Sequence, residues 1–161
     1  KMTVEQGETI RSEFKETFFL NVRTGDRDKT MAREVCEGVA GLLNTKGGDL
    51  FVGVNDQSEV VGIDAELEQL YQGNQDKYLV QIANQFDTQL DPNALSHFEF
   101  KLVSVDGKLV LWIQIDKSPT AIWFAEKNSK TKTALPFRHG PTTRLAVGPD
   151  AVKLANEIEA R

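Results

Sequence analysis

The segment FEFKLVSVDGKLVLWIQI, residues 98–115, carries the clearest structural pattern in the sequence. Two runs rich in β-branched and aromatic residues, Phe98–Val105 and Lys108–Ile115, flank the dipeptide Asp106-Gly107. Asp-Gly between two such runs is typical of a tight hairpin turn, because both turn positions need a positive φ that these residues tolerate. The segment therefore predicts a β-hairpin.

A second hairpin is predicted upstream of this one. After Gly47-Gly48, which interrupts regular structure, a β-branched and aromatic run covers Asp49–Val54, reaches turn-forming residues at 55–58 and resumes at Val60–Ile63. Glu13–Leu20 has strand-like spacing of polar and apolar residues. Leu135–Arg138 predicts a further short strand.

Three segments predict helices. Apolar residues recur at helical spacing over Asp28–Asn44 and again over residues 79–90, where Asp91-Pro92 ends the pattern. Pro149–Ala160 begins with a proline near its first turn, as many helices do. Ala125–Thr133 predicts a loop. The sequence thus predicts an α+β fold, in which a mixed or antiparallel sheet of two hairpin units is packed against helices.

Length and composition favour one folded domain. The 161 residues are 40% hydrophobic and 27% charged, which fits a globular protein and excludes a disordered or fibrous one. The longest apolar runs have about five residues, against roughly 20 for a membrane-spanning helix. The single cysteine, Cys36, lies on the apolar side of its helix, so we expect a buried, inert thiol and a cytoplasmic protein. Because Lys1 precedes Met2, we expect residues 1–161 to be one domain of a larger protein with further domains.

Charge is unevenly distributed along the chain. The net charge is −5, yet residues 46–100 hold 2 Lys/Arg against 10 Asp/Glu, whereas residues 101–145 hold 8 against 3. In the basic region, cations alternate with Trp123, Phe124 and Phe137, a mixture that suits holding phosphates and stacking bases. The candidate cations are Lys117, Lys127, Lys130, Lys132, Arg138 and Arg144. A solvated lysine-rich loop explains the same residues equally well.

Motif order excludes several kinds of site. NTKGG at residues 44–48 is similar to a phosphate loop, but it follows a helix and opens a strand, the reverse of a Walker or Rossmann loop, so a structural turn is favoured. HExxH and zinc deaminase signatures are absent. Carboxylates beside the upstream hairpin remain, namely Glu8, Glu13, Asp49 and Asp56, and such oxygens suit Mg²⁺ or Mn²⁺. Glu8 and Glu13 are five positions apart, so they converge only through a bulge or a bend.

Four blocks of sequence share the pattern of a known family. They are ETIRSEFK at residues 8–15, VAGLLNTKGG at 39–48, LFVGVND at 50–56 followed by VGI at 61–63, and LPFRHGPTT at 135–143. These blocks resemble the E-x4-E-F-K, AFANTxGG, LxxGVDD and YxRxGxST segments of the Schlafen-type AlbA-like domain, also described as a divergent AAA-type or DNA-binding domain. They occur in the family's order over nearly the whole chain, which makes the resemblance specific.

The resemblance implies a chemistry. In family members that cut RNA, the two glutamates of E-x4-E and an aspartate of GVDD form a metal-dependent endoribonuclease site. The resemblance places these catalytic and metal-binding roles on Glu8, Glu13 and Asp56 of this sequence, with Mg²⁺ or Mn²⁺ as the cofactor. Lys15 and Arg138 would steady the charge of the scissile phosphate. Asn55 stands where the family has its first aspartate.

The resemblance therefore implies a nucleic-acid-binding domain, for RNA or DNA, of a prokaryotic protein, with endoribonuclease activity as its catalytic form. The alternative is a non-catalytic DNA-binding module of a transcriptional regulator, in which the carboxylates are structural. An ATP-binding domain is less favoured, because the sequence has no Walker A loop. Since family nucleases pair two lobes, activity would need a homodimer or a second lobe.

Overall fold

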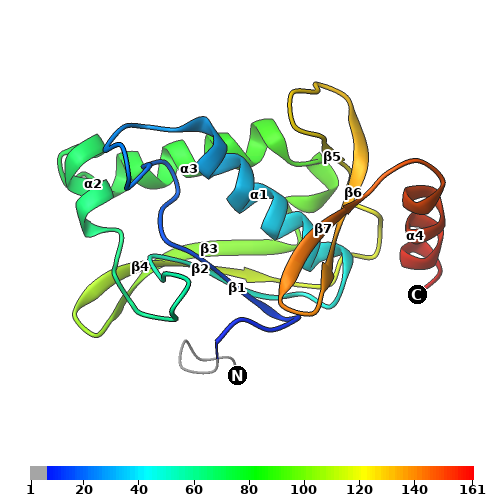
Figure 1. The fold of residues 1–161 in the computed structure, drawn as a ribbon, viewed down its shortest axis with the longest axis horizontal. Helices are drawn as coiled ribbons and strands as arrows, with labels where there is room; N and C mark the ends of the chain where they lie inside the picture. Colours follow the sequence, from blue (N-terminus) through cyan, green and yellow to red (C-terminus); the bar gives the residue numbers. More distant parts are fainter. Residues whose placement is uncertain (1–6) are drawn as a thin grey trace.

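The computed structural model describes residues 7–161 and arranges them as shown in Figure 1. The strands are β1 (Ser12–Lys15), β2 (Gly48–Val52), β3 (Phe98–Val105), β4 (Lys108–Ile115), β5 (Phe124–Ala125), β6 (Lys132–His139) and β7 (Thr142–Ala146). The helices are α1 (Lys29–Asn44), α2 (Asp64–Tyr71), α3 (Gln75–Gln89) and α4 (Gly148–Ala160), with a short 3-10 turn at Pro92–Ala94. The predicted α+β fold is confirmed.

A four-stranded sheet has the strand order β1-β2-β4-β3. β1 runs parallel to β2, and the other neighbours are antiparallel. The hairpin predicted at residues 98–115 is confirmed with the boundaries of both strands. Its turn residues Asp106 and Gly107 have φ of 52° and 76°, which explains why Asp-Gly stands there.

The prediction of an upstream hairpin is wrong for its second strand. Residues Val60–Ile63 form no strand and contribute a single bridge, from Val60 to Val54. β2 already pairs with β1 on one side and β4 on the other, so no hydrogen-bonding edge is left for a hairpin partner. β1 covers only the beginning of the predicted strand Glu13–Leu20, because the N–H groups of residues 18–20 turn to the carboxylate of Glu66.

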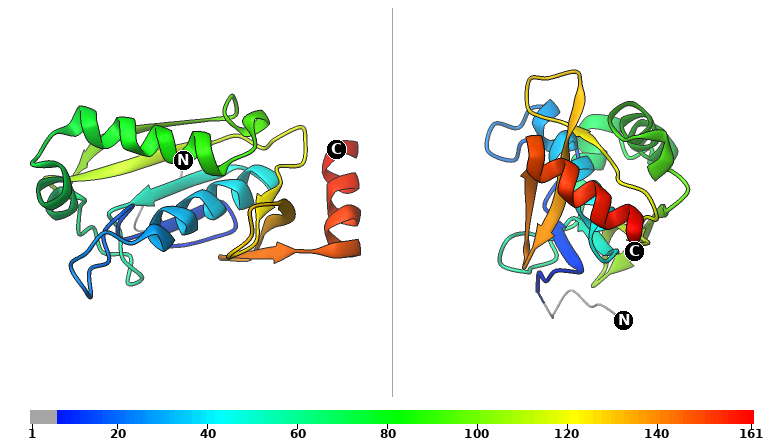
Figure 2. Two further views of the ribbon diagram at one scale, coloured as in Figure 1. Left: turned by 90° about the horizontal axis from the view of Figure 1, so that it is seen from above. Right: turned by 90° about the vertical axis from the view of Figure 1, so that its right-hand side faces the viewer.

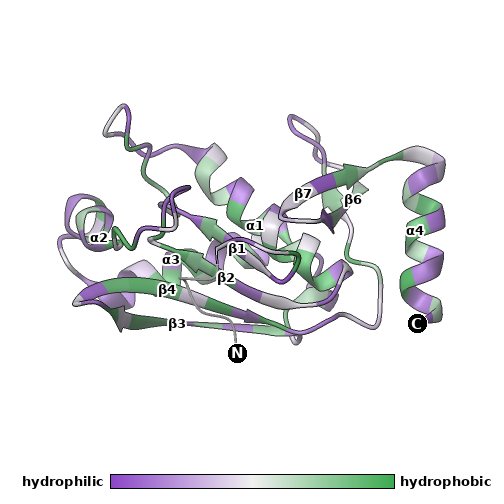
Figure 3. Cartoon of the chain, turned by 60° about the horizontal axis from the view of Figure 1, so that its bottom comes forward, coloured by the Kyte–Doolittle hydropathy of each residue, from purple (hydrophilic) through white to green (hydrophobic). Residues whose placement is uncertain are grey.

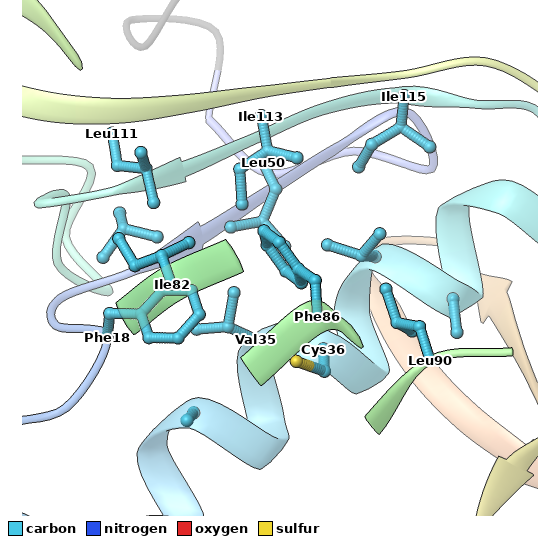
Figure 4. Close-up of a cluster of buried hydrophobic side chains, with 14 of the residues drawn as sticks. Phe18, Val35, Cys36, Leu50, Ile82, Phe86, Leu90, Leu111, Ile113 and Ile115 are labelled. Carbon is cyan, nitrogen blue, oxygen red and sulfur yellow. The ribbon is translucent and has the colours of Figure 1, made fainter. Parts of the chain in front are cut away.

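Helices α1 and α3 cover one face of this sheet (Figures 1 and 2). α1 confirms the predicted helix, and the Asp28 carboxylate caps it by accepting the Thr30 N–H at 2.9 Å. The main core fills the space between helices and sheet, where Cys36, Phe86 and Leu111 are buried (Figure 4). α3 confirms the helix predicted over residues 79–90, whereas α2 was not predicted.

A second sheet has the strand order β5-β6-β7. β6 packs against α1, and α4 packs on β6 and β7 at one end of the molecule (Figures 1 and 2). Figure 3 shows hydrophobic and hydrophilic bands alternating along α4, the pattern of a helix with one buried face. The predicted strand Leu135–Arg138 lies within the longer β6, α4 confirms the C-terminal helix, and β7 was missed. Within residues 7–161, the structure has no helix of the length and apolar character needed to cross a membrane.

Gly47 and Gly48 form the turn between α1 and β2. The Gly47 N–H donates to the Leu42 carbonyl at 2.7 Å and so ends the helix. Both glycines have positive φ, and a Cβ on Gly48 would collide with the carbonyl of Arg11. The structural turn favoured from the sequence is confirmed, because a side chain does not fit at this position.

Candidate functional site

A groove of about 390 Å³ opens where β1, α1 and the β6–β7 hairpin meet, and we call it the carboxylate groove. It brings together five residues singled out from the sequence: Glu8, Glu13, Lys15, Asp56 and Arg138. The other lining residues are Phe14, Glu34, Glu37, Pro141, Thr142 and Thr143. Glu34 and Glu37 were not predicted, although their place on the polar side of a predicted helix was a usable signal.

Glu8 and Glu13 reach the same groove through a bend before β1. Thr9 and Ser12 exchange backbone hydrogen bonds, so the chain turns back between the two glutamates. One oxygen of the exposed Glu8 side chain accepts the Phe14 N–H at 2.8 Å. The bend that the spacing required is therefore present, and it uses Glu8 as a hydrogen-bond acceptor.

Glu13 is buried in an ion pair with Arg138. Arg138 Nη1 lies 2.5 Å from Glu13 Oε1, and each residue is 4% exposed. The Thr143 hydroxyl donates to the same oxygen at 2.8 Å, and Lys15 Nζ lies 3.2 Å from the other one. Arg138 also donates to the carbonyls of Thr9 and Ser12. Arg138, expected to hold a phosphate, thus has both terminal nitrogens engaged by protein groups.

Burial and charge act against each other in this cluster. Burial lowers the pKa of Arg138, and the neighbouring Glu13 charge opposes that shift. Burial by itself would lower the pKa of Lys15, but the combined attraction of nearby carboxylates, Glu13 foremost, raises that pKa above its usual value. The Glu13 charge thus favours the charged form of both side chains.

Two glycines on α1 make room for the ion pair. A Cβ on Gly38 would lie 2.7 Å from Glu13 Oε2, and one on Gly41 would lie 2.9 Å from the Thr143 methyl carbon. Because they are three positions apart, both lie on the helix face that covers the groove. This pair was not predicted, and its signal in the sequence is two glycines on the inner face of a predicted helix.

The three residues expected to bind metal share the groove without forming one ligand set. In the part of the chain that the structure describes, no group of three His, Cys, Asp or Glu side chains could hold a metal ion. Both oxygens of Glu13 are engaged by cations or a hydroxyl, and Asp56 lies exposed in the turn after β2. This arrangement does not fit a metal held by Glu8, Glu13 and Asp56 together.

A second hollow of about 340 Å³ lies between the C-terminal end of α3, α1 and the loop from β5 to β6, and we call it the basic cleft. Arg33, Lys130 and Lys132 line it, and Glu126 is the one acid among its described lining residues. The carboxylate groove has five carboxylates against two cations. The two hollows therefore have opposite charge, and Arg33 was not among the predicted cations.

The remaining predicted cations lie apart. Lys127 is exposed in the same β5–β6 loop as Lys130, whereas Lys117 is exposed between β4 and β5 and Arg144 is exposed on β7. The structure thus gathers part of the predicted basic region at the basic cleft, buries Arg138 and leaves Lys117 and Arg144 on other elements.

The mixed sheet, the second three-stranded sheet and the carboxylate groove between them define a class of α+β domain with a charged cavity beside its first strand. A family model described as Schlafen, AlbA_2 matches residues 8–147. The chain belongs to this family, as its four sequence blocks predicted.

Similarity to a solved structure supports the fold. The DIP2311 protein from Corynebacterium diphtheriae is similar over 85% of this chain, with 21% sequence identity and a TM-score of 0.56. The match covers 22% of that protein's chain. No curated protein matches the sequence.

Proposed function

We propose that this domain binds nucleic acid through the basic cleft and the lysines beside it. The observation that carries the proposal is that Arg33, Lys130 and Lys132 line one hollow. Lys127 is exposed nearby, in the β5–β6 loop that also holds Lys130. Cations gathered in this way neutralise backbone phosphates, which is the main source of affinity for nucleic acids. Membership in the Schlafen AlbA_2 family supports the same proposal.

Binding to labelled tRNA, single-stranded DNA and double-stranded DNA at low and moderate salt tests this proposal. Lys130→Ala/Lys132→Ala should weaken binding and lower the slope of log affinity against log salt by about 1.4–1.8, since each phosphate contact contributes roughly 0.7–0.9. Lys77→Ala/Lys153→Ala removes the same charge from exposed sites on α3 and α4 and should leave the slope unchanged. Equal effects of the two double variants would contradict the proposal.

RNA cleavage at the carboxylate groove is the second candidate function, and it rests on Glu8, Glu13 and Asp56 lining one cavity. Because Arg138 and Lys15 occupy Glu13, this activity would require Glu13 to leave its ion pair. Incubation of tRNA with Mn²⁺ or with EDTA tests it, and Glu8→Gln and Asp56→Asn are suitable variants because both residues are exposed. Cleavage that needs metal and is lost in these variants supports a nuclease. Binding without cleavage supports the non-catalytic module.

A homodimer remains part of this second candidate, since nucleases of the family pair two lobes. Light scattering of the purified domain with and without RNA measures its mass directly. A monomer that cleaves RNA would show that a second lobe is not needed.

A further inference from the structure

The basic cleft is lined by neutral polar residues as well as by cations. Thr88, Gln89, Asn128 and Ser129 line it among the cations, and although the Thr88 hydroxyl donates to the Asn84 carbonyl and the Gln89 amide to Gln85, their oxygens can still accept hydrogen bonds. These groups come from the end of α3 and from the β5–β6 loop, on either side of Arg33. A ligand in the cleft therefore meets neutral hydrogen-bonding groups as well as a guanidinium and two ammonium groups.

Arg33 is held in position by the protein. Its Nη2 donates to the Ala125 carbonyl at 2.8 Å, and its guanidinium carbon lies 5.2 Å from the centre of the Phe124 ring. Nη1 is 3.7 Å from Glu37. A guanidinium has five N–H donors, and Arg33 makes one side-chain hydrogen bond among residues 7–161. Its other donors can pair with phosphate oxygens, for which this planar group is well suited.

The size of the cleft distinguishes an unpaired nucleotide from a duplex. Small-molecule sites have roughly 300–1,000 Å³, so a cleft of about 340 Å³ has room for little more than one nucleotide unit. A double helix carries its phosphates on a convex outer surface, so it would reach the exposed Lys127, Lys130 and Lys132 at the rim of the cleft more readily than the half-buried Arg33. An unpaired nucleotide can turn its phosphate inwards.

We propose that the basic cleft binds the phosphate and sugar of one unpaired nucleotide, so that the domain prefers single-stranded nucleic acid to duplex. This inference rests on the proposed function and specifies its substrate class. The phosphate pairs with Arg33 and the lysines, and the polar groups of the walls face the sugar and the base edge. Rim contacts alone then account for the weaker binding of duplex.

Fluorescence anisotropy with a strand of about 10 nucleotides and with the blunt duplex of the same sequence tests the preference. We expect the strand to bind about tenfold more tightly. Arg33→Ala should remove most of this difference by weakening the strand, whereas Arg23→Ala, an exposed arginine outside the cleft, should leave both affinities unchanged. Because Arg33 also contacts Ala125, thermal melting verifies folding, and Lys132→Ala provides a second variant at an exposed position.

Competition identifies the group that is bound. Displacement of the strand by 5′-AMP, with adenosine and inorganic phosphate much weaker, is the expected result. Equal affinity for strand and duplex, an equal loss for both in Arg33→Ala, or displacement by phosphate as strong as by 5′-AMP would each overturn the inference and leave the proposed function standing. Binding to neither nucleic acid at low salt, by a folded protein, would overturn both.

Discussion

Breaking the Glu13–Arg138 ion pair should destabilise the domain strongly. Glu13→Gln keeps the size of the side chain but leaves the buried Arg138 charge without its partner. Removing one member of a buried ion pair costs about 3–5 kcal/mol. Arg138→Met should cost more, because the carbonyls of Thr9 and Ser12 each lose a hydrogen bond from Arg138 while keeping the one that they exchange with each other, at about 0.5–1.5 kcal/mol for each lost bond. These losses are a large part of the roughly 5–15 kcal/mol that keeps a domain folded.

Urea unfolding at pH 7, followed by tryptophan fluorescence, measures these free energies. Glu16→Gln and Arg11→Met change exposed residues of the same types and should stay within about 0.5 kcal/mol of the parent. The variant that carries both Glu13→Gln and Arg138→Met should lose less than the sum of the single losses, because the second change no longer leaves a buried charge alone. A loss below about 1 kcal/mol for Glu13→Gln, or strictly additive losses, would refute this reasoning.

Three further predictions concern the core and the carboxylate groove. Glu66→Gln should lower the free energy of unfolding by about 1–3 kcal/mol, because the buried carboxylate accepts the N–H groups of residues 18–20 and the Tyr78 hydroxyl; an unchanged urea midpoint would speak against this role. Burial raises the pKa of the Cys36 thiol, so a thiol reagent should label the protein only as fast as it unfolds, and rapid labelling of the native state is the contrary result. Burial also raises the pKa of the Glu37 carboxyl, so its charge opposes folding above that pKa, and Glu37→Gln should raise Tm at pH 7. The gain in Tm should vanish as the pH falls below the ordinary value of 4.5, and a gain independent of pH would exclude titration of Glu37 as its cause.

Local patterns in the sequence predicted the elements that local physics determines. The β3–β4 hairpin follows from alternating residues and one Asp-Gly turn, and α1 follows from its apolar spacing and the Asp28 cap. α2 gives a weaker signal in the sequence because it has only eight residues. Its buried Glu66 accepts hydrogen bonds from backbone N–H groups 46 to 48 positions away, which no local pattern predicts. The parallel pairing of β1 with β2 is equally non-local, which is why a hairpin was predicted instead.

The sequence and the family resemblance pointed to Glu8, Glu13 and Asp56 of the carboxylate groove, but the groups that pair with Glu13 were not predicted. Arg138 is 125 positions from Glu13, and Thr143 is 130 positions away, so no spacing rule connects them. From the sequence, Arg138 was expected to be one of the cations that hold a phosphate, whereas the fold makes it the counterion of a buried acid. Arg33 was missed for the same reason, since Ala125 of β5, whose carbonyl accepts its hydrogen bond, lies 92 positions downstream.

Helix α1 connects the two hollows electrostatically. Arg33 lines the basic cleft, Glu37 lines the carboxylate groove, and the two are one helical turn apart with Nη1 and Oε1 separated by 3.7 Å. Burial raises the pKa of Glu37, and the Arg33 charge partly offsets this increase. A phosphate in the basic cleft would compete with Glu37 for Arg33, so the carboxyl would take up a proton more readily.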